Sequence, residues 1–383
     1  MKHITSEICA KKNYSIEFLR ILFAVLIVHF HLFHANIQSY VQWADWQTRF
    51  FNTWHSMMFV DAFCIISGFF LYNTVNSQTK VSFVRFAFRR FARLWPIFAF
   101  AMICLMGFGA AGLYFMQNGF QTFLNLMFMQ CNGLSIGNYC NGITWFVSPF
   151  FFGLLFYFGL IKSVDKKVST FIVALLVYFG YVVFANSGLN AESMWGAKMM
   201  ASFINMGMVR ICAGIGAGYL VAVLYNHVKD NNIFTNLKYR KLNFILFSIL
   251  EILLICVIIH RTVFLQMEFQ NLFVFIPMFV MLVFAFAMQQ GIISKITNHK
   301  ISAFMGRYAY SIYIMQQIAF ILLGLTLWKC TEFVNANENL TVFLSLVFAV
   351  ILGMAVYHII ELPALRFAKR LEQIADNSDK KSE

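Results

Sequence analysis

The stretch SIEFLRILFAVLIVHFHLFHA, residues Ser15–Ala35, decides the fold class of this chain. Its length and apolar character suit one helical crossing of a bilayer, yet it contains Glu17, Arg20 and His31, which are costly to bury in lipid. His31 follows Arg20 by eleven residues, which is three helical turns plus about 20°. The two side chains should therefore share one helix face, about 16 Å apart along the axis, with Glu17 one turn before Arg20. We expect this polar face to point into the protein rather than into lipid.

Two more histidines lie in the same stretch. His34 lies one turn beyond His31 on the same side, whereas His29 falls near the side opposite Arg20. A purely structural interpretation pairs Glu17 with Arg20 and lets the histidines hydrogen-bond between helices. We favour a functional interpretation for the aligned set, because buried charges that only support packing rarely offset their desolvation.

The composition excludes a soluble globular domain. The 383 residues are 60% hydrophobic and 12% charged, include 47 Phe, and have a mean hydropathy of +0.71. Apolar runs of membrane length recur along the whole chain. They predict an all-α polytopic membrane protein with about ten transmembrane helices, at residues 15–36, 55–73, 95–115, 143–162, 168–186, 207–226, 242–260, 271–289, 309–328 and 341–361.

The positive charges predict the orientation. Of the 29 Lys and Arg residues, 23 fall on the same side of the predicted membrane as the N-terminus, and four fall on the other side. Because cytoplasmic loops carry the excess of Lys and Arg, both termini should be cytoplasmic. The net charge of +13 thus reflects topology, and we expect no nucleic-acid partner.

The same pattern predicts the domain organisation. We expect a cytoplasmic N-terminus at 1–14, a single membrane domain at 15–361 and a cytoplasmic tail at 362–383. The tail begins as a basic amphipathic helix and is too short to form a second domain.

Cysteine spacing indicates no metal site. Cys131 and Cys140 lie nine positions apart in a predicted outer loop, among Gly and Asn residues that favour turns. A disulfide between them suits an oxidising exterior, but Cys330 near the same face leaves the pairing open.

The second predicted inner loop reads KVSFVRFAFRRFARLWP. Arg85, Arg89 and Arg93 recur every four residues on one helix face, and Arg90 flanks them. We expect Pro96 to end this helix and to start the third span. One interpretation is an interfacial helix that anchors the loop. The close spacing of these arginines at the cytoplasmic end of the predicted bundle favours a phosphate-rich ligand instead. One guanidinium group can donate two parallel hydrogen bonds to the oxygens of a phosphate.

The second predicted span reads FVDAFCIISGFFLYN. Asp61 lies near its outer end, where a carboxylate also suits the positive end of a helix dipole. Ser67 and Gly68 lie deeper, and such small residues allow either a neighbouring helix or a ligand to approach closely.

These stretches together resemble the acyltransferase-3 family of integral membrane acyltransferases, which O-acetylate sugars and related acceptors. The family pattern of Arg, ten residues and His is met by Arg20 and His31. Its FF-x-x-SGF stretch is similar to FCIISGF at Phe63–Phe69, with Asp61 in the usual place.

The remaining family motifs follow in order along nearly the whole chain. The motif RR-x-x-R-x-x-P is met by RRFARLWP at Arg89–Pro96. GRYAYSIYIMQQ at Gly306–Gln317 is similar to the family's G-x-x-SYxxYLxH segment, and HIIELPALR at His358–Arg366 is similar to its closing E-x-P segment. The chain departs from the family in two places: Gln316 replaces the late His, and the fourth span lacks a Glu that many relatives carry.

The resemblance implies an O-acetyltransferase of the cell inner (plasma) membrane, crossing it many times and lacking a fused esterase-like domain. It would transfer an acetyl group from cytoplasmic acetyl-CoA to a hydroxyl of a cell-envelope polysaccharide or glycolipid. His31 would deprotonate that hydroxyl or accept the acyl group transiently, and both routes stay open. Arg20 would steady the CoA or the developing oxyanion, Glu17 would hold Arg20, and Asp61 joins the catalytic candidates through its place in the family motif.

The donor site implied by the resemblance lies at the inner mouth. The CoA phosphates would bind Arg89, Arg90 and Arg93, and Ser67 and Gly68 would give the donor close access. The long pantetheine arm would then reach toward the catalytic histidine.

Two other classes of function remain as alternatives. A secondary transporter or glycolipid flippase would use the Arg20/His31 face as a proton-coupled path. Such proteins often have paired halves with matching helix breaks, and we find no such internal symmetry. A purely structural membrane scaffold would leave this polar face without a purpose.

Overall fold

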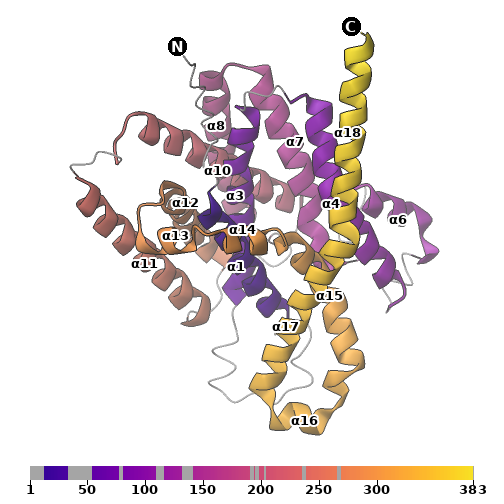
Figure 1. Ribbon diagram of the computed structural model, residues 1–383. Helices are drawn as coiled ribbons and strands as arrows, with labels where there is room; N and C mark the ends of the chain where they lie inside the picture. Colours follow the sequence, from indigo (N-terminus) through magenta and orange to yellow (C-terminus); the bar gives the residue numbers. More distant parts are fainter. Residues whose placement is uncertain are drawn as a thin grey trace, which may run out of the picture.

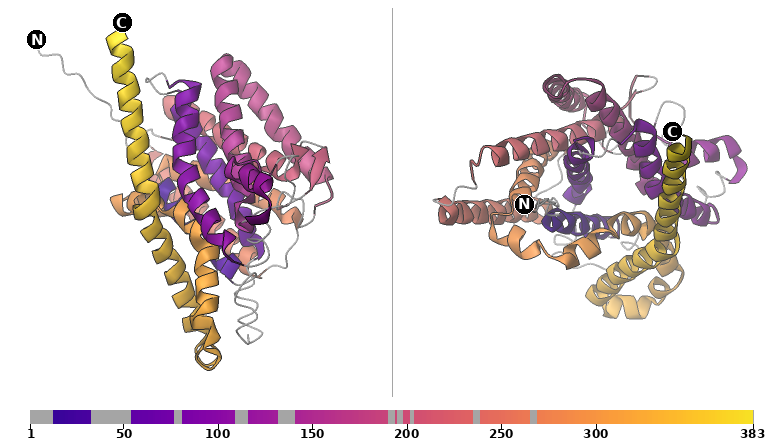
Figure 2. Two further views of the ribbon diagram at one scale, coloured as in Figure 1. Left: turned by 90° about the vertical axis from the view of Figure 1, so that its right-hand side faces the viewer. Right: turned by 45° about the horizontal axis from the view of Figure 1, so that its top comes forward.

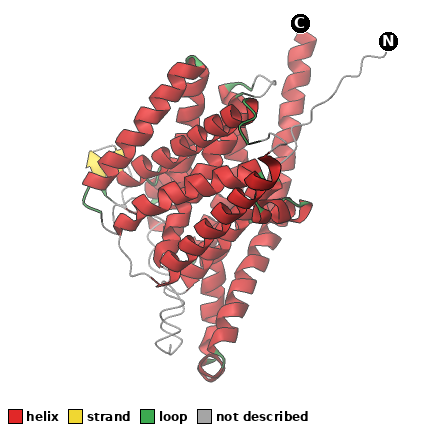
Figure 3. Cartoon of the chain, turned by 90° about the vertical axis from the view of Figure 1, so that its left-hand side faces the viewer, coloured by secondary structure: helices red, strands yellow, loops and turns green. Residues whose placement is uncertain are grey.

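The computed structural model describes residues 13–32, 54–76, 81–108, 116–131, 141–189, 194, 198–201, 204–234, 239–264 and 269–382. Apart from turns and loops, the described residues form helices and one antiparallel pair of short strands, β1 (Met199–Ala201) and β2 (Ile204–Asn205) (Figure 3).

The helices divide into long and short ones. The long helices are α1 (Tyr14–His31), α3 (Phe59–Val75), α4 (Phe83–Met106), α7 (Val147–Ser163), α8 (Lys166–Asn186), α10 (Met206–Asp230), α11 (Arg240–Phe264), α12 (Leu272–Met288), α15 (Ala309–Leu325), α17 (Glu338–Val356) and α18 (Leu362–Ser382). The short ones are η2 (Trp54–Met58), α6 (Gly119–Leu126), η3 (Gly142–Phe146), η5 (Phe269–Asn271), α13 (Ile292–Thr297), α14 (Lys300–Gly306), η6 (Leu327–Lys329), α16 (Thr331–Ala336) and the π-helical turn η7 (Tyr357–Glu361).

The long helices confirm the predicted fold class. Among the described residues, eight helices are long and apolar enough to cross a membrane. Two further predicted spans correspond to α12, a shorter apolar helix, and to α4, whose first half carries the arginines. The protein is therefore an all-α polytopic membrane protein.

The expected helix break before Pro96 is wrong, because α4 continues through this proline to Met106. A proline inside a helix removes one N–H donor, but neighbouring helices stabilise the interrupted stretch in membrane proteins. Here Trp95 Nε1 donates a hydrogen bond to the Leu126 carbonyl at 2.8 Å. The arginine-rich segment and the third span consequently belong to one continuous helix.

Helices α3 and α10 pack closely at the centre of the bundle. A Cβ atom added at Gly218 of α10 would overlap the carbonyl of Ile65, and one added at Gly68 of α3 would overlap the carbonyl of Ile215. Only glycine allows the two backbones to approach this far, as in other membrane helix pairs. Gly68 therefore serves helix packing, the structural alternative that its sequence context left open.

Helix α1 lies in the middle of the molecule and contacts α3, α12, α14, α15 and α17 (Figure 1). Its first turn is fixed to the end of α12, because Ser15 Oγ donates to the Phe286 carbonyl at 2.8 Å. Helix α14 ends against the same turn, where a Cβ atom at Gly306 would lie 2.7 Å from Glu17 Oε2. The polar face of α1 is thus enclosed by protein, as the sequence predicts.

The last helices, α17, η7 and α18, follow one another and end in a long C-terminal helix that runs beside α4 (Figures 1 and 2). The hairpin of α15 and α17 extends from the opposite end of the molecule. Arg89 Nε of α4 pairs with Glu372 Oε1 of α18 at 2.8 Å. The tail is therefore attached to the arginine-rich end of α4.

Candidate functional site

A cavity of about 230 Å³ lies between α1, α3, α4, α7 and α15. It is lined by Glu17, Arg20, Phe63, Ser67, Phe70, Arg90, Arg93, Leu94, Phe146, Phe150, Ala309, Tyr310 and Tyr313. The structure therefore brings together five of the predicted site residues, which are separated by up to 76 positions in the sequence: Glu17, Arg20, Ser67, Arg90 and Arg93.

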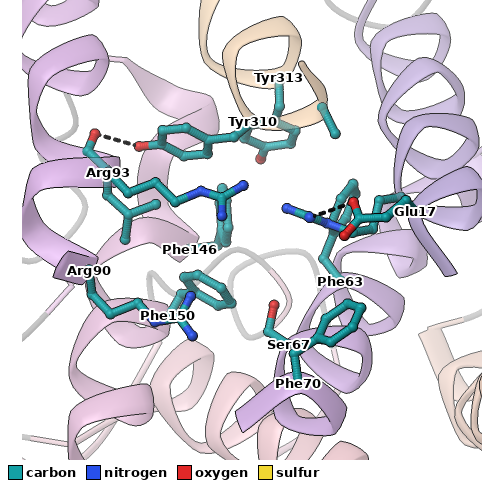
Figure 4. Close-up of a pocket in the computed structure, with 13 residues that line it drawn as sticks. Glu17, Phe63, Ser67, Phe70, Arg90, Arg93, Phe146, Phe150, Tyr310 and Tyr313 are labelled. Atoms are coloured by element: carbon teal, nitrogen blue, oxygen red, sulfur yellow. Dashed lines mark hydrogen bonds and ion pairs between the residues drawn. The ribbon is translucent and has the colours of Figure 1, made fainter. Parts of the chain in front are cut away.

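One wall of the cavity is cationic. Arg90 and Arg93 reach into it from α4, and Glu17 lies on the opposite wall (Figure 4). Among the described residues, neither arginine has an ion-pair partner, and Arg90 stacks on the Phe86 ring with 5.0 Å between its guanidinium carbon and the ring centre. Two guanidinium groups that face a cavity without a carboxylate partner attract an anion.

The opposite wall carries an internal ion pair. Arg20 Nη1 and Glu17 Oε2 lie 2.9 Å apart, one helical turn from each other on α1. Both the structural and the functional interpretation of the sequence expect this Glu17–Arg20 pair. The lining of the cavity then contains three arginines and one carboxylate, so a ligand with several negative charges would balance it.

Arg89 does not line the cavity. Its side chain is 51% exposed and lies against α18, where Nε and Nη2 both bond to the Glu372 carboxylate. Arg90 and Arg93 lie on the cavity side of α4, and Arg89 lies at the edge that α18 covers. The structure therefore separates Arg89 from the two arginines with which its motif groups it.

Asp61 also lies outside the cavity, in a buried pair with Arg210 of α10. Arg210 Nη2 is 2.5 Å from Asp61 Oδ2, and both side chains are fully buried. Arg210 Nη1 donates to the Met194 carbonyl at 2.7 Å, and its guanidinium carbon lies 5.7 Å from the centre of the Trp145 ring. The pair joins α3 and α10 and contacts Trp145 of η3, which is a structural role that the sequence alone could not assign.

We expect the replacement Asp61→Asn to destabilise the protein, because it leaves the Arg210 charge buried without its partner. Breaking a buried ion pair in this way costs about 3–5 kcal/mol of folding free energy. Thermal melting of the purified protein should show a large fall in melting temperature for Asp61→Asn, and a smaller fall for the double variant Asp61→Leu/Arg210→Met. A wild-type melt combined with lost activity in Asp61→Asn would instead place Asp61 in the chemistry.

His31 lies beside the cavity but does not line it. The ring centres of His31 and Tyr313 are 6.5 Å apart, and Tyr313 forms part of the cavity wall. Because α1 is continuous from Tyr14 to His31, the predicted alignment of His31 with Arg20 along one face holds. His31 Nδ1 lies 3.1 Å from Gln316 Oε1, so α15 supplies a hydrogen-bond partner for this ring nitrogen.

His34 and Cys140 lie outside the described residues. The predicted Cys131–Cys140 pairing therefore also falls outside them.

The aromatic half of the cavity was not predicted from the sequence. Much of its wall is formed by Tyr310 and Tyr313 of α15, Phe146 at the end of η3 and Phe150 in the first turn of α7 (Figure 4). Tyr310 Oη donates to the Leu94 carbonyl at 2.9 Å, which ties α15 to α4 beside the arginines. In a chain with 47 Phe and 15 Tyr, helical spacing does not distinguish such residues from ordinary core residues.

Glu361 is a buried carboxylate outside the cavity lining that the sequence analysis did not single out. It is buried at the end of the π-helical turn η7, which contacts α4, and its Oε2 accepts a hydrogen bond from Ser311 Oγ at 2.5 Å. Its Oε1 has no hydrogen-bond partner among the described residues. The closing E-x-P segment contained the signal, because a glutamate inside an apolar span is expensive unless it has a function.

One of three comparisons with known proteins found a match. The family model described as acyltransferase domain matches residues 13–358, which is nearly the whole chain. The chain belongs to this acyltransferase family. No curated protein and no solved structure matches it.

The family assignment confirms the resemblance predicted from the motifs, and it identifies the protein as a multi-pass membrane acyltransferase. The matched range includes every residue that lines the cavity. It ends before Glu361 and before α18.

Proposed function

We propose that this acyltransferase moves an acetyl group from cytoplasmic acetyl-CoA to a hydroxyl of a cell-envelope polysaccharide or glycolipid at the plasma membrane. The observation that carries the proposal is the cavity, in which Arg90 and Arg93 face the Glu17–Arg20 pair at one end of the α1 polar face. His31 lies at the other end of the same face.

The cationic wall supports a CoA thioester as the donor. CoA carries a diphosphate and a 3′-phosphate, whose oxygens suit the planar forks of Arg90 and Arg93. A cavity of about 230 Å³ is too small for a whole CoA molecule, so the nucleoside would extend toward the cytoplasm. The arginine-rich half of α4 lies at that side by the positive-inside pattern.

The aromatic wall supports the path of the pantetheine arm. Tyr313 lies between the cavity and His31, and its Oη donates to the Ile143 carbonyl at 2.7 Å. Its ring packs edge-to-face on Phe146 at 4.9 Å between ring centres. A thin, largely apolar arm that passes these rings brings the thioester to the histidine.

The positions of the polar residues favour distinct roles. Arg20 lines the cavity with Arg90 and Arg93, about 16 Å from His31 along α1, so we assign it to the phosphates rather than to an oxyanion beside His31. His31 is then the general base that takes the proton of the acceptor hydroxyl as its oxygen attacks the thioester carbonyl.

Comparison of the surface glycans of cells with and without this protein tests the proposal. Mass spectrometry should show glycan fragments that are lighter by one acetyl group when the gene is deleted, and the wild-type gene should restore them. The loss of the whole glycan from the surface, with its acetyl groups intact inside the cell, would support a transporter or flippase instead.

A further inference from the structure

Gln316 is buried in α15 and makes two hydrogen bonds that fix the direction of its amide. Its Nε2 donates to the Tyr313 carbonyl at 2.8 Å, one turn earlier in the same helix. Its Oε1 lies 3.1 Å from Nδ1 of His31. If the amide were flipped, its oxygen would face the Tyr313 carbonyl, and two acceptors would meet in a buried place.

This orientation determines which nitrogen of His31 carries the proton. The Gln316 oxygen can only accept a hydrogen bond, so Nδ1 of His31 must donate one. In a neutral imidazole the other nitrogen then holds the lone pair, because the partner of one ring nitrogen sets the tautomer of the ring. Since an amide does not titrate, Gln316 presents the same acceptor at every pH.

We propose that Gln316 is a positioning residue that holds His31 in the Nδ1-protonated tautomer, so that Nε2 is the atom that takes the proton of the acceptor. The inference rests on the proposed function for the identity of that acceptor, but the tautomer itself follows from the hydrogen bonds of Gln316.

Acyl transfer by this His31 tautomer requires no reactant other than the acceptor hydroxyl and the thioester. The proton of the acceptor hydroxyl moves to His31 Nε2 while the hydroxyl oxygen bonds to the acetyl carbonyl carbon. The carbon–sulfur bond of the thioester then breaks, and the CoA thiolate takes the proton from Nε2. The products are an acetyl ester and CoA with a free thiol, and His31 returns to the same tautomer.

Nitrogen-15 NMR of the full-length protein, labelled on histidine and held in detergent micelles, reads the tautomer directly. The His31 signals are the set that disappears in His31→Gln. Nε2 is recognised because it couples to both carbon-bound ring protons, whereas Nδ1 couples strongly to only one. We expect a protonated Nδ1 and an unprotonated Nε2 in the wild-type protein.

Two variants of Gln316 and one neighbour test the consequence for activity. Gln316→Met removes the acceptor and should give a mixture of tautomers and a kcat about 10- to 100-fold lower, with KM for acetyl-CoA changed by no more than about twofold. Gln316→Glu keeps an oxygen acceptor and should retain more activity than Gln316→Met. Gln317→Met, at the next position of α15, should match the wild-type protein.

The outcomes separate this inference from the proposed function. A wild-type His31 protonated at Nε2 overturns the inference, as does Gln316→Met with wild-type kcat and tautomer. A protein that neither binds acetyl-CoA nor transfers an acyl group, while His31 is protonated at Nδ1, supports the tautomer and overturns the proposed function. If Gln316→Met does not fold, the wild-type spectrum and the activity of Gln316→Glu still test whether Gln316 sets the tautomer of His31.

Discussion

Replacing His31 with alanine is expected to lower the rate of acyl transfer by about 10²-fold or more, because it removes the general base. His31 lies next to the cavity wall at Tyr313 and shares the polar face of α1 with Arg20. His31→Gln should not restore the rate, since an amide can hydrogen-bond but cannot take the proton of the acceptor. The measurement is acetyl transfer by the purified variants, with thermal melts to show that each one folds.

His29 provides the matched control on the same helix. It lies near the side of α1 opposite Arg20, so His29→Ala should keep most of the activity at equal expression. His34→Ala should cause a partial loss, because the sequence places His34 one turn beyond His31 on the same side. Inactive His29→Ala together with active His31→Ala would refute both the assigned helix face and the mechanism built on it.

Arg90→Ala and Arg93→Ala are each expected to weaken acetyl-CoA binding by about 1.5–3 kcal/mol, the usual value of a hydrogen bond to a charged group. This corresponds to a loss of affinity of about 10- to 150-fold. Both guanidinium groups face the cavity, where among the described residues the only carboxylate in the lining is already paired with Arg20. Titration of acetyl-CoA into the purified variants measures the effect.

Arg89→Ala is the matched control for these two variants. Arg89 lies outside the cavity and pairs with Glu372, and a solvent-exposed pair is worth at most about 1 kcal/mol. Acetyl-CoA that lacks the 3′-phosphate or the nucleotide should bind more weakly to the wild-type protein and should respond less to Arg90→Ala and Arg93→Ala. An Arg89→Ala variant that loses as much affinity as Arg93→Ala would mean that the arginine-rich half of α4 binds acetyl-CoA as a whole rather than through the cavity.

The spans and the polar face of α1 could be predicted from the sequence for simple physical reasons. A bilayer requires long apolar helices, so every span left a local signal. The relation between Arg20 and His31 depends only on helical rise and rotation within one helix, and α1 is continuous between them. The Glu17–Arg20 pair followed from the same local geometry.

The separation of Arg89 from Arg90 and Arg93 was not available from the motif. All three lie within five residues, and which of them faces a ligand depends on how α4 rotates against α15 and α18. The pairing of Glu372 with Arg89 is a contact between residues 283 positions apart. Spacing within α4 cannot reveal such a contact.

The role of Asp61 also depends on a contact between distant residues that local spacing cannot reveal. Its place in a family motif indicated chemistry, whereas the structure buries it against Arg210, 149 positions away. Both charges were visible in the sequence, but pairing requires that α3 and α10 pack through Gly68 and Gly218. The aromatic wall of the cavity was hidden for a different reason, since its residues resemble the rest of an aromatic-rich core.

Binding of the acyl donor's phosphates in the cavity beside α4 can be observed by electron cryomicroscopy of the full-length protein with a non-transferable acetyl-CoA analogue. We expect phosphate density between Arg90 and Arg93, with the acyl end passing Tyr313 toward Nε2 of His31. Density for the analogue outside this cavity, with Arg90 and Arg93 unoccupied, would contradict it.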